Sequence, residues 1–199
     1  MKPSSHASSS DENQSLARFP SPGEVRLVRL LPGPIERVWD FILDPEKRAR
    51  WFCGGTWEQK PGGRAVFAMR HKNLAPDETP PPEYAKVQDP GVSFEGRVLR
   101  CEPPRLLEFT FGCDDSVVTF DLTPEGDKVR LLLIHRASGE ERKDVGSFAS
   151  GWHIHFGMLI ALLENTPRAS FWGEYARLKP IYSRMSDTSP DAGCISSRS

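Results

Sequence analysis

The stretch VGSFASGWHIHFGMLIALLE, residues 145–164, decides the fold of this chain. Apolar residues recur in it at steps of three and four: Val145, Phe148, Ala149, Trp152, Phe156, Leu159, Ile160 and Leu163. This spacing predicts a helix of about 20 residues with a long apolar face. A face of that length needs a large partner surface within the same chain.

Segments with a period of two precede this helix and supply the partner surface. Apolar and polar residues alternate over 107–111 and over 118–122, which indicates strands with one buried face. Further strands are predicted at 24–30, 56–60, 64–69, 93–101 and 128–136. Two short helices are predicted after the first strand, one opening at Gly33-Pro34 and one capped by Asp44. Strands in one block with helices on one side indicate an α+β fold, in which a curved antiparallel sheet wraps the long helix.

The 199 residues suit one domain with short tails. Residues 1–23 and 186–199 are rich in serine and poor in aromatic residues, so we expect both to be disordered tails around a folded domain at 24–185. A third segment, 71–91, holds five prolines and several acidic residues. It is predicted to be a long loop over or near whatever the strands enclose.

Charge and composition exclude several classes of protein. Lysine and arginine number 26 against 27 acidic residues, so no basic excess is available for a nucleic-acid partner. No stretch approaches 18 apolar residues, and the N-terminus lacks the apolar core of a secretory signal. We therefore expect no membrane span and a cytoplasmic location. The four cysteines show no metal spacing, and no phosphate-binding glycine motif is present, so neither a metal nor a cofactor is predicted.

Several stretches, taken in their order, resemble the activator-of-Hsp90-ATPase-like branch of the START-like (SRPBCC) superfamily. They are LPGPIERVWDFILDPEKRARWFCGG (31–55), FEGRVLRCEPPRLLEFTF (94–111), VVTFDLTPEGDKVRLLLIHR (117–136), SGWHIHFGMLIALLE (150–164) and FWGEYARLKP (171–180). The resemblance implies a helix-grip (START/Bet v 1-like) fold, with about seven antiparallel strands around the C-terminal helix and a cavity between them. It also implies a breadth of functions, since the superfamily includes lipid carriers, hormone receptors, polyketide cyclases and co-chaperones.

Aromatic side chains are the first candidates to line such a cavity. Ten large rings occur within about 120 residues, and some must face the space between sheet and helix. The candidates taken from the two strands and the long helix are Phe109, Phe111, Phe120, Trp152 and Phe156. The alternative for any one of these rings is ordinary core packing.

Histidines supply the polar candidates. His153 and His155 lie about 200° apart on the predicted helix, so they cannot share a metal ion, but either could reach the cavity rim. His135 shares a strand face with Leu133 and Leu131, so it would be an imidazole beside an apolar cavity or a hydrogen-bonded structural histidine. His135 and His155 are therefore candidate ligand contacts. The basic run 47–50 is interpreted as a solvated helix face.

Three hypotheses about function follow. The one favoured is binding of a small apolar or aromatic molecule without catalysis. The second is an enzyme of the polyketide cyclase, dehydratase or hydrolase type that uses the same cavity, although no pair of carboxylates or nucleophile motif is visible. The third is an Hsp90 co-chaperone-like interaction, with a chaperone partner and a place in the stress response. The mixed polar surface neither demands nor excludes a homodimer.

Overall fold

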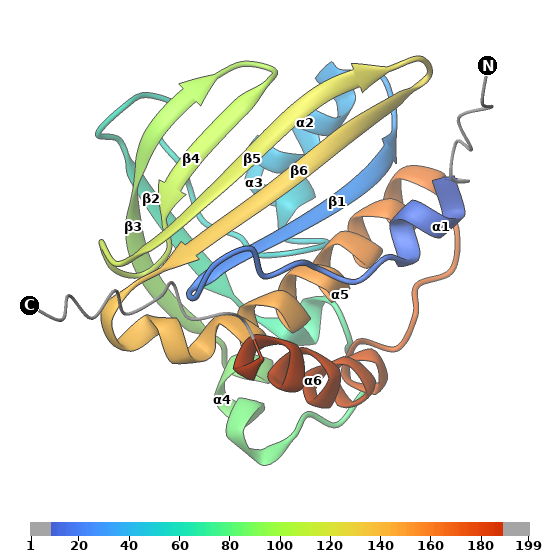
Figure 1. Cartoon of the computed structure of the whole chain (residues 1–199). Helices are drawn as coiled ribbons and strands as arrows, with labels where there is room; N and C mark the ends of the chain where they lie inside the picture. The colour runs from blue at the N-terminus through green and yellow to red at the C-terminus, as the bar shows by residue number, and fades with distance from the viewer. Residues whose placement is uncertain (1–8, 189–199) are drawn as a thin grey trace, which may run out of the picture.

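A computed structural model describes residues 9–188 and shows one antiparallel sheet wrapped over one long helix (Figure 1). The six strands run in the order β1-β6-β5-β4-β3-β2. Their bounds are β1 Glu24–Pro32, β2 Arg64–Met69, β3 Val92–Glu102, β4 Leu106–Thr110, β5 Ser116–Glu125 and β6 Lys128–Ala137. The expected α+β helix-grip architecture is confirmed.

The sheet has six strands where about seven were expected. The predicted strand at 56–60 forms only an isolated bridge between Trp57 and Ala65. Gly55 adopts a φ of +92°, which turns the backbone out of the extended conformation just before this segment. The chain therefore passes beside β2 without building a ladder.

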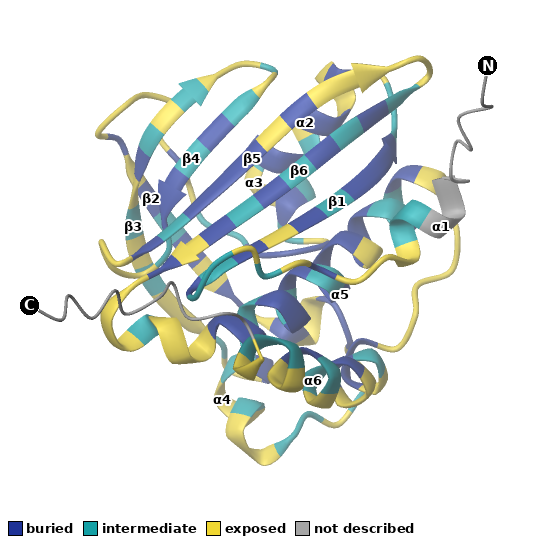
Figure 2. Ribbon diagram, in the orientation of Figure 1, coloured by how far each residue is buried: buried dark blue, intermediate teal, exposed yellow. Residues whose placement is uncertain are grey.

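The sheet is curved, and its concave face is the core. Buried and half-buried residues alternate along most of β6, and Val129, Leu131 and Leu133 are among the buried ones (Figure 2). At Gly96 in β3 the carbonyl oxygen of Thr110 approaches so closely that a Cβ would lie 2.0 Å from it. Only glycine permits so close an approach. Gly96 lies near the point where β3 stops pairing with β2 and begins to pair with β4.

The helix α5, Val145–Glu164, fills the concave face and follows the 3₁₀ turn η3, Gly139–Asp144. Its other side is covered by α6, Phe171–Asp187, which contains Pro180 (Figure 1). Because both sides are covered, α5 is apolar around most of its circumference. By length and composition alone the segment Gly139–Glu164 could cross a membrane, but its place under the sheet makes it a core helix.

Two short helices, α2 (Ile35–Leu43) and α3 (Pro45–Arg48), follow β1. Asp44 caps α3 by accepting hydrogen bonds from the amides of Glu46 and Lys47. The run 47–50 was expected to be a solvated helix face, but this prediction is wrong for Arg48. The guanidinium of Arg48 is fully buried, because it donates to four backbone carbonyls and stacks 3.9 Å above the ring of Trp57.

The expected tail over 1–23 is ordered from residue 9 onward. The helix α1, Ser9–Gln14, leads into a segment that covers β1, an edge strand of the sheet. The Asn13 side chain exchanges two hydrogen bonds with the backbone of Leu30, and the Ala17 amide donates to the Tyr182 hydroxyl. This part of the tail is ordered because it satisfies the polar groups of an edge strand. The rest of the predicted tails, 1–8 and 189–199, lies outside the described residues.

The segment 71–91 forms a compact strap of short helical turns: η1 His71–Asn73, η2 Pro82–Tyr84 and α4 Ala85–Gln88. It leaves the end of β2, crosses to α6 and returns to β3 (Figure 1). The prediction of a long loop near the space that the strands enclose agrees with this position. Below, residues 71–91 are called the strap.

Candidate functional site

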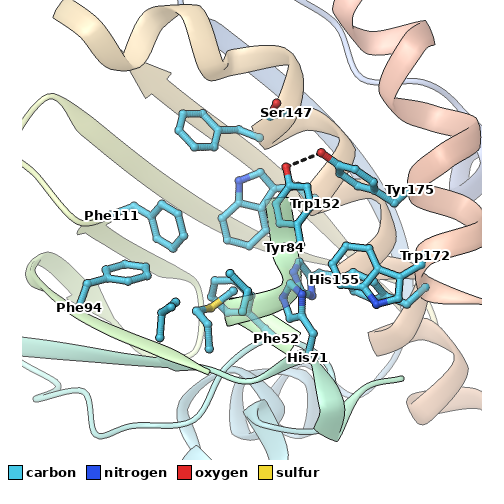
Figure 3. A pocket seen from close by; sticks show the side chains of 16 residues that line it. Phe52, His71, Tyr84, Phe94, Phe111, Ser147, Trp152, His155, Trp172 and Tyr175 are labelled. Carbon is cyan, nitrogen blue, oxygen red and sulfur yellow. Dashed lines mark hydrogen bonds between the residues drawn. The ribbon is translucent and has the colours of Figure 1, made fainter. Parts of the chain in front are cut away.

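A cavity of about 250 Å³ lies where the strap, α5, α6 and the end of the sheet meet (Figure 3). Aromatic rings form most of its wall, and its polar members are two histidines, two tyrosines and a serine. The lining residues are Phe52, Met69, His71, Tyr84, Val87, Val92, Phe94, Phe111, Ser147, Phe148, Gly151, Trp152, His155, Phe171, Trp172 and Tyr175.

Three of the seven candidate residues line this cavity: Phe111, Trp152 and His155. The other four do not. Phe109, Phe120, His135 and Phe156 are each fully buried in the core. The segment that follows α3 covers two of them: Trp57 packs 4.9 Å from Phe109 and Trp51 packs 5.9 Å from Phe156, centroid to centroid. Rings of α5 cover the other two, since Trp152 lies 5.5 Å from Phe120 and Phe148 stacks 4.4 Å from His135. Only the end of the sheet under the strap is left open.

His135 has a structural role, which was the alternative interpretation. Its Nδ1 accepts a hydrogen bond from the indole of Trp152 at 3.0 Å, so Nε2 carries the proton and donates to the Ser116 hydroxyl at 2.8 Å. Burial lowers the pKa of His135 to about 3, which keeps the ring neutral. Both ring nitrogens of His135 therefore have partners within the protein. The bond at Nδ1 holds the indole of Trp152, which itself forms part of the cavity wall.

His155 and His153 point to opposite sides of α5, as their spacing predicts. His153 Nδ1 shares a hydrogen bond of 2.7 Å with the Tyr182 hydroxyl, away from the cavity. His155 is buried at the cavity, and its Nδ1 donates to the carbonyl oxygen of Trp51 at 2.8 Å. Its Nε2 is therefore an unprotonated acceptor.

His71 lines the cavity but was not among the residues predicted from the sequence. It lies on the strap, is 7% exposed, and its ring centroid is 5.5 Å from that of His155 (Figure 3). Neither of its ring nitrogens has a hydrogen-bond partner among the residues that the structure describes. Burial, followed by the neighbouring His155, lowers the pKa of His71 to about 3. The available signal was its place at the start of a proline-rich loop.

The other lining residues that were not among the candidates come from β2, the strap, β3, α5, α6 and the turn after α3. Phe94 lies on β3, Phe52 follows α3, and Trp172 and Tyr175 lie on α6. The stretch 171–180 contributed to the family resemblance but was given no role in the cavity, because the strap that turns α6 into a wall has no periodic pattern. The aromatic pair Phe171-Trp172 at the start of α6 was the one signal in the sequence.

A carboxylate clamps the strap to α6. Glu78 accepts hydrogen bonds from the amides of Phe171 and Trp172 and from the hydroxyl of Ser170, at 2.8–2.9 Å. These amides are at the N-terminus of α6, where backbone donors lack helical partners and negative charge is favoured. Gln88 adds a second tie by accepting from the Trp172 indole at 3.1 Å. The strap is therefore held closed over the cavity.

Glu78→Ala is expected to lower the free energy of unfolding by about 1–2 kcal/mol, because three donors at the start of α6 lose their acceptor. Chemical denaturation measures this loss. Glu83→Ala is the matched control, since Glu83 pairs with Lys179 on the surface and also joins the strap to α6. Its loss should be much smaller because water replaces an exposed ion pair. Equal losses in the two variants would show that Glu78 is not the clamp.

Two tyrosines close the upper rim of the cavity. The hydroxyls of Tyr84 on the strap and Tyr175 on α6 are hydrogen-bonded to each other (Figure 3). Burial, together with this bond, raises the pKa of Tyr175, so its hydroxyl stays protonated at neutral pH. Within residues 9–188, no group of three histidine, cysteine or acidic side chains could hold a metal ion.

The sequence profile described as "Activator of Hsp90 ATPase homolog 1-like protein" matches residues 32–164, two thirds of the chain. The chain belongs to this family. Membership of this family places the protein in the START-like superfamily. None of the curated proteins is similar enough to it to count as a match.

Solved structures agree with this assignment. A protein from Bordetella parapertussis, solved by NMR, is 37% identical over 81% of this chain and 85% of that chain, with a TM-score of 0.70. CalU16 from Micromonospora echinospora is 23% identical over 87% of this chain and 97% of its own, with a TM-score of 0.59. DynU16, from the dynemicin biosynthetic locus, is 22% identical over 74% of this chain and 50% of its own, with a TM-score of 0.56. The last two show the fold alone.

The family match ends at residue 164, before α6 begins at Phe171. The wall formed by Phe171, Trp172 and Tyr175 therefore lies outside the matched range. One side of the cavity therefore comes from the matched domain and the other from the segment that follows it.

Proposed function

We propose that this protein binds a small apolar or aromatic molecule in the cavity under the strap, without chemical conversion. The observation that carries the proposal is the wall itself. Rings from the strap, the sheet, α5 and α6 surround one space of about 250 Å³, and the side chains of the protein do not fill it. A ligand would gain the burial of its apolar surface at a site whose rings are already in place.

The volume limits the size of the ligand. An engineered apolar cavity of about 150 Å³ binds benzene. The cavity of about 250 Å³ in this protein therefore has room for about two fused rings. Naphthalene is a suitable apolar probe, because it has this size and no polar group.

Gly151→Leu is expected to abolish binding of naphthalene without unfolding the protein. Gly151 lines the cavity from α5, and a Cβ at this position meets no atom within 4 Å. A leucine side chain would occupy the space that the ligand needs, and it favours a helix more than glycine does by about 1 kcal/mol. We expect naphthalene affinity, measured by equilibrium dialysis, to fall at least about tenfold, equivalent to about 1.4 kcal/mol.

Gly157→Leu is the matched control on the same helix. Gly157 is exposed, and a Cβ there also meets no atom within 4 Å, but the residue does not line this cavity. The variant should gain the same helix propensity and bind naphthalene like the wild type. Equal naphthalene binding by wild type and Gly151→Leu would overturn the proposed site.

Two other hypotheses stay predictions with direct tests. An enzyme of the cyclase, dehydratase or hydrolase type would convert the molecule that native mass spectrometry finds bound to the purified protein. A co-chaperone would change the ATPase rate of Hsp90. The predicted cytoplasmic location is tested by cell fractionation, and native mass spectrometry tests for the possible homodimer.

A further inference from the structure

We propose that His71 and His155 form the polar end of the cavity and select a neutral, flat ligand that carries a hydroxyl group, of the phenol or naphthol class. This inference rests on the proposed function and names the chemistry of its ligand. It follows from three features of the site: unpartnered imidazole nitrogens, the fixed tautomer of His155, and the charge of the wall.

The first feature is an unmet hydrogen-bonding capacity. His71 is only 7% exposed and lines the cavity. Its Nδ1 and Nε2 have no hydrogen-bond partner within residues 9–188. Leaving buried polar groups such as these unpaired is unfavourable, because they lose their hydrogen bonds to water without gaining others. The other buried histidines, His135 and His155, do have hydrogen bonds within the protein. We therefore infer that the nitrogens of His71 are paired by a molecule bound in the cavity.

The second feature is the direction of the bonds. Because His155 Nδ1 donates to the Trp51 carbonyl, its Nε2 can only accept. A neutral His71 offers one N–H donor and one acceptor. A ligand hydroxyl both donates and accepts, so it can donate to His155 and accept from His71 at the same time. A carboxylate can only accept, so it would leave His155 Nε2 unpaired.

The third feature is the absence of charge. None of the 16 lining residues is an acidic, lysine or arginine side chain. Burial lowers the pKa of His155 to about 4 and that of His71 to about 3, so both rings are neutral at pH 7. An ion would lose its hydration here without finding an opposite charge, which favours a neutral ligand.

Rings around the histidines favour a flat ligand. Phe52 lies 5.1 Å from His155, and Phe171 lies 4.7 Å from His71, between ring centroids. Trp152 lies 4.9 Å from Phe52 and continues the wall away from the polar end. A planar aromatic body can stack among these rings while its hydroxyl reaches the two imidazoles.

The test compares 2-naphthol with naphthalene by equilibrium dialysis against the full-length protein at pH 7. We expect 2-naphthol to bind at least about tenfold more tightly, since the hydroxyl pairs two buried nitrogens that naphthalene leaves unpaired. Equal affinities would overturn the polar end and leave the proposed function intact. If neither compound bound, the proposed function would fall with it.

Variants assign the preference to the two histidines. His155→Asn keeps an amide donor near the Nδ1 position for the Trp51 carbonyl and removes Nε2, and His71→Leu removes both free nitrogens of the strap. Each should bring the affinity ratio of 2-naphthol to naphthalene within about threefold of one. His153→Asn, the same change two residues away, should keep the wild-type ratio because His153 faces Tyr182. An unchanged ratio in both His71→Leu and His155→Asn would contradict the assignment.

Discussion

Acidification from pH 7 to pH 5 is expected to destabilise the folded protein by on the order of 5 kcal/mol. Three histidines are buried and neutral in the fold: His71, His135 and His155. Burial lowers their pKa values to about 3, about 3 and about 4. In the unfolded chain each titrates near its ordinary pKa of about 6.5. A loss of this size is comparable with the whole stability of a typical domain.

The sign follows from which state binds the protons. Above pH 6.5 the histidines are neutral in both states, so stability does not depend on them. Below pH 6.5 the histidines of the unfolded chain are protonated while those of the folded chain stay neutral. Each buried histidine therefore lowers the free energy of unfolding by about 1.4 kcal/mol per pH unit. The loss continues until the pH reaches the lowered pKa values near 3–4. His153, whose pKa burial lowers to about 3, adds to it in the same direction.

Urea unfolding curves at half-unit steps from pH 8 to pH 5 measure this effect. We expect a flat free energy of unfolding above pH 7 and, with His153 included, a slope of about three to four protons near pH 5.5. Surface carboxylates such as Asp44, Asp89 and Glu95 have lowered pKa values, so their protonation falls below this window. A flat profile from pH 7 to pH 5 would show that the histidines are not protected from protons.

Arg48→Lys is expected to lower the free energy of unfolding by at least about 3 kcal/mol, although the charge is kept. The guanidinium donates to the carbonyl oxygens of Ile42, Leu43, Cys53 and Gly55. A lysine ammonium has no planar fork, so it would leave several of these buried oxygens unpaired. It would also lose the stacking on Trp57.

Arg50→Ala supplies the matched control for this prediction. Arg50 lies two residues away on the same basic run and is exposed. Its removal should change the midpoint of urea unfolding only slightly, as surface substitutions do. If Arg48→Lys lowered the free energy of unfolding as little as Arg50→Ala, the hydrogen bonds of the buried Arg48 guanidinium would not be what holds the turn after α3 in place. A larger loss in Arg48→Lys is the expected result.

The strap gives the cavity its closed form. Glu78 and Gln88 tie it to the start of α6, while Tyr84 and Tyr175 join at the rim. His71 reaches the cavity only because the strap lies there. A ligand under it would therefore contact both the strap and α6, so binding should add to the clamp that Glu78 provides.

Much of the architecture was predictable because it follows from local periodicity. The three- and four-residue spacing in 145–164 specified α5, and alternation at 107–111 and 118–122 specified β4 and β5. The two-residue spacing of His153 and His155 also fixed that they face opposite sides of α5. These inferences need only the geometry of a helix or a strand.

The cavity itself depended on contacts between distant segments. Phe111, Trp152 and His155 were predicted and line it, but His71, Tyr84 and Trp172 come from a proline-rich strap and from α6. Whether Phe109 and Phe156 line a cavity or fill a core is decided by Trp57 and Trp51, which pack against them. Arg48 and Arg50 are alike in the sequence, and only the carbonyls around Arg48 bury it. Periodicity determines which face of an element is apolar, whereas the packing of segments far apart in the chain determines what covers that face and where space is left.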